Sequence, residues 1–82
     1  MKYIDQDNPR CTYYIRETLN GFAIQVLDVA RDERFPLTRG IANQIGLVLP
    51  DGFRCHCSAN EHDELVAQLK SLADLNGLIE IE

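Results

Sequence analysis

The chain has only short apolar runs, such as Gly46-Leu47-Val48-Leu49. A membrane-spanning helix needs about 20 mostly apolar residues, so no membrane partner is expected. The stretch from Met1 to Asp7 lacks the apolar segment of a secretory signal peptide. Cysteine is scarce and odd in number, at three residues, which is a poor basis for a disulfide framework. Because cytosolic thiols stay reduced, these absences together predict a cytoplasmic protein.

The signatures of common catalytic sites are also missing. Gly40, Gly46 and Gly52 are too dispersed for a phosphate-binding loop or a dinucleotide fingerprint. The sequence has neither a nucleophile elbow around serine nor a histidine pair at metalloprotease spacing. Carboxylates are plentiful, but none form a convincing catalytic pair. We therefore expect a protein that is not an enzyme and that needs no cofactor.

Basic residues are almost absent from the last third of the chain. The 82 residues are 45% hydrophobic, 26% charged and carry a net charge of -5, which predicts one small domain over residues 1–82. Residues 55–82 hold only Lys70 against six acidic side chains, namely Glu61, Asp63, Glu64, Asp74, Glu80 and Glu82. A phosphate backbone repels such a surface, so we expect no direct nucleic-acid partner.

The first half of the chain predicts a β-hairpin. Residues 1–10 are polar and end near Asn8-Pro9, which indicates a loosely ordered N-terminal arm. Residues 11–18 and 22–29 alternate apolar and polar side chains as strands do. Asn20-Gly21 between them suits a turn whose central residues need positive φ. One face should carry Cys11, Tyr13, Ile15, Phe22, Ile24 and Val26, and the opposite face Thr12, Tyr14 and Arg16.

The middle of the chain gives weaker signals. Residues 30–37 mix charges of both signs around Pro36 and predict an exposed loop. Residues 38–45 favour a short helix with Thr38 as its N-cap, because apolar residues recur every four positions. Residues 45–50 and 52–58 predict a second hairpin around Pro50-Asp51-Gly52.

The C-terminal third predicts the main helix. Residues 60–76 form a helix with Asn60 as N-cap, an apolar stripe and a stop at Gly77. Residues 78–82 alternate as a last strand. The predicted fold class is α+β: two layers, with a mostly antiparallel sheet of about five strands and one long helix on one face, in the order β-β-(short α)-β-β-α-β.

Cys55, His56, Cys57 and His62 form the most chemically suggestive cluster. Sulfur and imidazole are usual zinc ligands, but a single residue separates the cysteines, which is too few for a structural zinc site. Cys57 with His62 as its base is a thiol hypothesis, which the acidic neighbours oppose. The preferred interpretation is buried structural cysteines, with a metal- or thiol-dependent site at Cys55, Cys57 and His62 as the alternative.

Two surfaces are candidates for binding another protein. One is the acidic start of the helix, Glu61, Asp63 and Glu64, which either meets a basic partner or is simply solvated. The other is the sheet face with Tyr14, Arg16 and Arg54, residue types enriched at interfaces. RNA binding by that face is a weaker hypothesis, because the protein is acidic and lacks an RNP-like motif.

The sequence therefore predicts a small regulatory protein-binding module that acts through the acidic helix or the exposed sheet face. A narrower hypothesis is an anti-CRISPR-like inhibitor, encoded by a phage or mobile element, whose acidic surface occupies the basic channel of a host nucleoprotein complex. Homodimer formation through a sheet edge or the uncovered face is a further hypothesis, since one helix cannot cover both sides of a sheet.

Overall fold

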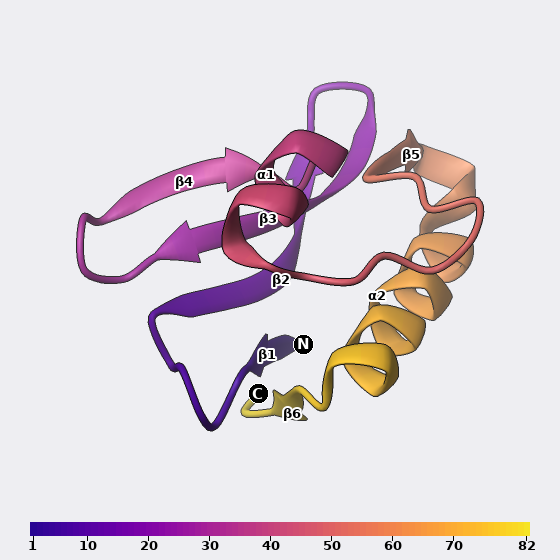
Figure 1. Cartoon of the computed structure of the whole chain (residues 1–82). Coiled ribbons are helices and arrows are strands. Elements are labelled where there is room, and N and C mark those ends of the chain that lie inside the picture. Colours follow the sequence, from indigo (N-terminus) through magenta and orange to yellow (C-terminus); the bar gives the residue numbers. More distant parts are fainter.

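The computed structural model describes residues 1–82 and contains a six-stranded sheet in which every pair of strands is antiparallel (Figure 1). The strand order is β4-β3-β2-β1-β6, and β5 pairs with β3 beside β4. The strands are β1 (Lys2–Ile4), β2 (Cys11–Thr18), β3 (Gly21–Asp28), β4 (Glu33–Pro36), β5 (His56–Ser58) and β6 (Ile79–Glu80). The helices are α1 (Arg39–Ile45), the 3-10 turn η1 (Ala59–Glu61) and α2 (His62–Asn76). None of them is long and apolar enough to cross a bilayer.

The predicted hairpin is confirmed as β2 and β3, but its turn differs from the prediction. Thr18 pairs with Gly21, so the loop is Leu19-Asn20, and neither of these residues has a positive φ. Gly21 serves a different purpose. A Cβ added to it would overlap the carbonyl oxygen of Cys57, so the missing side chain is what lets β5 lie against β3.

Two segments that were expected to be irregular are strands. Residues 1–10 were predicted as a loose arm, but Lys2–Ile4 form β1 between β2 and β6. Tyr3 is buried there, and both edges of its strand are hydrogen-bonded. The predicted exposed loop at 30–37 contains β4, in which Phe35 lies opposite Val26. Its charged neighbours suit a solvent-exposed edge strand, which explains the misleading sequence signal.

The predicted second hairpin at 45–58 is wrong. Gly46 ends α1 with φ of 75°, residues 47–50 have no regular structure, and only His56–Ser58 form a strand. A side chain replaces the partner strand that this segment lacks. The Asn76 amide accepts from the Val48 N–H at 2.8 Å and donates to its carbonyl at 2.7 Å. These bonds hold the loop against the end of α2.

Both predicted helices are present. Thr38 caps α1, since its hydroxyl accepts from the Ile41 N–H at 3.2 Å. The main helix starts later than expected, because η1 precedes it and the Asn60 cap is replaced by contacts between Ser58 and Glu61. Gly77 ends α2 in the left-handed conformation, as predicted.

The core lies between one face of the sheet and the helices. Tyr13 pairs with Val26 and Ile15 with Ile24, so the predicted shared face is confirmed. The leucine stripe of α2 packs against this face and is almost fully buried; it consists of Leu65, Leu69 and Leu72. α1 covers the β4 end of the same face, where Ile41 lies by Val26 and Phe35. The predicted two-layer α+β class is confirmed, and the opposite sheet face is uncovered.

Candidate functional site

The six residues predicted to bind a partner fall into two separate groups. Tyr14 and Arg16 share the uncovered sheet face, as expected from their alternation in β2. Arg54 does not join them, because β5 begins only at His56. Its guanidinium lies 3.2 Å from the Glu61 carboxylate and 3.4 Å from that of Glu64. The placement of Arg54 with Tyr14 and Arg16 was therefore wrong.

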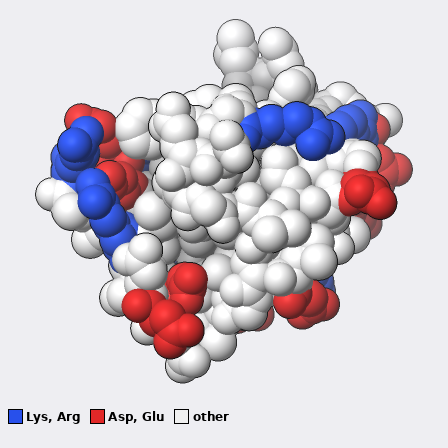
Figure 2. All heavy atoms as spheres, viewed as in Figure 1, with Lys and Arg blue, Asp and Glu red and all other residues white.

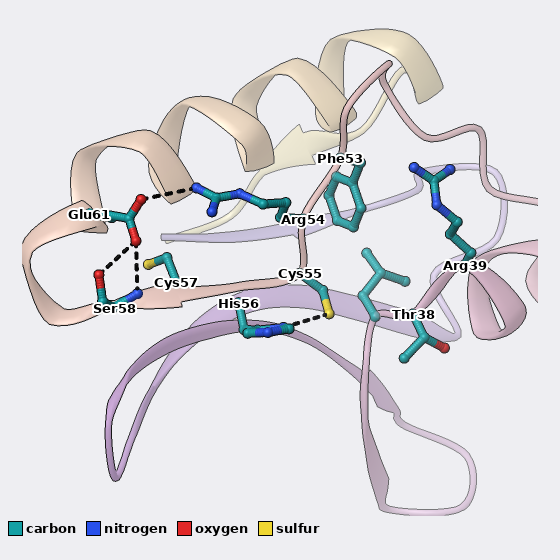
Figure 3. A pocket seen from close by; sticks show the side chains of 10 residues that line it. Thr38, Arg39, Phe53, Arg54, Cys55, His56, Cys57, Ser58 and Glu61 are labelled. Carbon is teal, nitrogen blue, oxygen red and sulfur yellow. Dashed lines mark hydrogen bonds and ion pairs between the residues drawn. The ribbon is translucent and has the colours of Figure 1, made fainter.

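Glu61 is held by contacts within the molecule (Figure 3). Its carboxylate accepts from the Ser58 hydroxyl at 2.6 Å and from the Ser58 N–H at 3.2 Å. These hydrogen bonds and the Arg54 guanidinium lower the pKa of Glu61 from 4.5 to about 2. Because its oxygens already have partners, Glu61 is better explained as part of the start of α2 than as a binding group. Asp63 is exposed and forms no ion pair.

A pocket of about 500 Å³ adjoins this cluster, between the start of α1 and the segment that leads into β5 (Figure 3). Leu37 and Phe53 provide apolar lining, and the Arg39 guanidinium lies beside Phe53. Arg54 also lines this pocket but points toward Glu61. The pocket therefore contains the Arg39 guanidinium, which forms no ion pair, together with an apolar lining.

The alternative metal- or thiol-dependent site at Cys55, Cys57 and His62 does not assemble in this structure. The Cys55 Sγ lies 3.6 Å from Nδ1 of His56, so the thiol–imidazole contact involves neighbouring residues. His62 instead packs against Phe22, with ring centroids 4.4 Å apart and the ring planes tilted by 55°. The fold brings no three His, Cys, Asp or Glu side chains into an arrangement that would hold a metal ion. All three cysteines are partly buried and unpaired.

The uncovered sheet face brings together residues from all six strands. Its central pair is Tyr14 and Gln25, whose side chains are joined by a hydrogen bond from the Tyr14 hydroxyl at 3.2 Å. The adjacent row across the sheet runs Arg34, Leu27, Thr12, Ile4 and Ile79. Thr12 is buried, while Leu27, Ile4 and Ile79 are only partly buried. This row is more apolar than a fully solvated sheet face requires.

Positive charge surrounds this row. Arg16 and Arg34 form no ion pair, whereas Lys2 binds the Glu82 carboxylate at 3.1 Å. His56 adds an imidazole beside Ala23. The strand register places no Asp or Glu on this face. We call this surface the open face; it comprises Lys2, Ile4, Thr12, Tyr14, Arg16, Ala23, Gln25, Leu27, Arg34, His56 and Ile79.

Sequence reasoning missed Lys2, Arg34 and Leu27 as members of this face. Lys2 and Arg34 lie in strands whose residues were predicted to be irregular. The sheet face on which their side chains lie therefore could not be predicted from alternation. Leu27 alternates in register with Gln25, and that signal was readable from the hairpin alone.

The helix side of the molecule differs from the open face. Figure 2 shows charged side chains around the margin of this side and none in its middle. The residues from Ile41 to Pro50 contain no charged side chain, and Val48 and Leu75 are exposed. This surface offers apolar contact without any charge that would select a partner.

Comparison of the chain with protein families, with curated proteins and with solved structures finds no match. A functional interpretation therefore depends on the geometry of the surfaces described above.

Proposed function

We propose that this protein is a small, non-enzymatic, cytoplasmic module that binds another protein through its open face. The observation that supports this proposal is the combination of a half-buried apolar row, centred on Leu27 and Ile4, with two arginines that have no ion-pair partner. Protein interfaces combine an apolar centre with tyrosine and arginine in this way. The three free cysteines fit a reducing compartment.

The acidic start of α2 is the weaker candidate surface. Arg54 neutralises part of its charge by contacting both Glu61 and Glu64. Of the three acidic residues predicted to bind a partner at this surface, only Asp63 forms no ion pair. An inhibitor that enters a basic channel would use this same surface, so that hypothesis loses support with it.

Site-specific photo-crosslinking distinguishes the two surfaces. A photoreactive phenylalanine analogue replaces Leu27 on the open face or Ala67, which is exposed on α2. In lysate of the native host, the proposal predicts one discrete crosslinked protein from position 27 and none from position 67. A crosslink from position 67 alone would move the binding surface to α2 and contradict the proposal. Thermal unfolding of both variants provides the control for folding.

A further inference from the structure

We infer that the partner of the open face is an acidic protein surface, one of whose carboxylates seats against Arg16. This inference rests on the proposed function and adds the chemistry of the partner. It depends on a local hollow, on the charges around it and on the absence of an ion pair between Arg16 and any carboxylate of this chain.

The hollow lies on the hairpin beside Arg16. It has a volume of about 570 Å³ and is lined by Arg16, Glu17, Thr18, Leu19 and Gln25. Arg16 pairs with Ala23, and Ala23 pairs with His56. Since neighbouring strands lie about 4.8 Å apart, the Arg16 and His56 side chains flank the small Ala23 at about 10 Å across the sheet. Ala23 is buried between them and His56 lines the separate pocket near Phe53, so Arg16 is the cationic group at the hollow.

Leu19 provides an apolar contact at the margin of this hollow. It lies at the turn of the hairpin and is 99% exposed, so it contributes no burial to the fold. A single exposed leucine is ordinary on a protein surface, but this one lines the same hollow as Arg16, which forms no ion pair. A carboxylate on Arg16 and an apolar group on Leu19 would together fit an acidic surface that also carries apolar side chains.

Charge complementarity indicates the charge of the molecule that would bind the open face. Arginine binds carboxylates with two parallel hydrogen bonds, and Arg16 forms no ion pair within its own chain, although Glu17 lines the same hollow. A second copy placed face to face would add its own Arg16 and Arg34 to an interface that already holds these cations, and like charges there are unfavourable. The occupant is therefore a different molecule that carries negative charge.

An acidic protein fits this face better than single-stranded RNA does. Binding of single strands depends on several aromatic rings that stack bases. The open face has one such ring, Tyr14, and the hydrogen bond to Gln25 holds its hydroxyl. The apolar row through Leu27 and Ile4 would instead meet apolar side chains of a protein.

Nuclear magnetic resonance titration tests the inference at residue level and detects weak binding. The probes are a glutamate–tyrosine copolymer, poly-L-glutamate and an oligouridylate of similar length, each added to the isotopically labelled full chain at low and high salt. We expect saturable amide shifts at Arg16, Ala23 and Gln25 with both acidic polypeptides, weakened by salt. Arg16→Glu should weaken binding about tenfold, which equals about 1.4 kcal/mol. The control Lys70→Glu has the same charge change at an exposed position of α2 and should leave affinity unchanged.

Leu19→Ser separates the apolar contact from the charge. It should remove the affinity advantage of the glutamate–tyrosine copolymer over poly-L-glutamate, without changing the melting temperature. Three results would overturn the inference: no saturable shifts with either acidic polypeptide, equal losses for Arg16→Glu and Lys70→Glu, or tighter binding of the oligouridylate. If a discrete protein still crosslinks to position 27 after such a result, the proposed function holds and only the acidic partner is wrong. If that crosslink is also missing, the proposed function and the acidic partner are both wrong.

Discussion

The two faces of the sheet have opposite chemistry although they share the same strands. On β3, Ile24 and Val26 face the helices and are 0% and 2% exposed, while Gln25 and Leu27 face away and are only partly buried. The covered face contributes the core. The open face carries unpaired cations, Arg16 and Arg34, around apolar side chains that no element of the chain covers. The difference indicates that the covered face determines stability, and binding through the open face is our proposal.

The largest expected effect comes from truncating the same kind of side chain on each face of β3. Ile24→Ala should lower the free energy of unfolding by about 4 kcal/mol, because it leaves a cavity in the core. Leu27→Ala should lower it by about 1 kcal/mol or less, since Leu27 is already partly hydrated. Urea unfolding of both variants measures this difference. Equal losses would mean that the two faces contribute alike to stability.

Gly21→Ala tests an exception to this comparison. Gly21 lies in the register of the open face, yet its substitution should cost about 3 kcal/mol, because the new Cβ overlaps the Cys57 carbonyl. Chemical denaturation measures the loss, and hydrogen exchange should show weakened protection where β5 pairs with β3. Gly52→Ala is the contrasting variant, since an added Cβ there meets no atom within 4 Å and only the positive φ opposes it. Unchanged stability of Gly21→Ala would refute the close approach of β5.

Asn76→Ala examines how the helix side is closed. The Asn76 amide bonds the Val48 backbone twice and also donates to the Leu72 carbonyl at 2.8 Å. Its loss should cost about 1–2 kcal/mol, because the Val48 backbone groups lose their partner. Faster amide exchange at Val48, with unchanged exchange in β2, is the expected signature. The account of this loop would be wrong if Val48 exchange stayed the same.

The smallest expected effect is a pH dependence at the start of α2. The folded pKa of Glu61, about 2, is below its ordinary value of 4.5, so its ionised form adds stability above about pH 4.5. This contribution is lost as the pH falls toward 2. Glu61→Gln should therefore be less stable than the parent protein at neutral pH, and the two melting temperatures should converge in acid. The difference should be modest and reduced by salt, since the group is solvent-accessible. A gap that stayed constant with pH would argue against this role.

Sequence patterns predicted the elements that are long enough to show a period. The hairpin of β2 and β3 and the leucine stripe of α2 each repeat over several turns or alternations, so their buried faces could be assigned. β1 has three residues, too few for a detectable alternation. Leu47 and Leu49 alternate like a strand, but they pack onto the core from a loop that Asn76 holds. A hydrogen bond from a side chain distant in the sequence produces no periodic pattern, so it cannot be predicted from alternation.

The candidate site was predictable only in part for the same reason. Tyr14 and Arg16 were placed on one face correctly, because they lie in a long strand. Arg54 was placed wrongly, since the strand that should have oriented it begins two residues later. Arg34 was missed because a charged edge strand resembles a loop.

Affinity capture with matched charge reversals on the two sides of the molecule tests the central claim most directly. Arg16→Glu changes the open face, and Asp63→Lys changes the exposed acidic start of α2. Tagged parent protein and both variants are incubated with lysate of the native host, and retained proteins are identified by mass spectrometry. The account predicts one partner that is retained by the parent protein and by Asp63→Lys but lost with Arg16→Glu. Retention by Arg16→Glu together with loss by Asp63→Lys would contradict it.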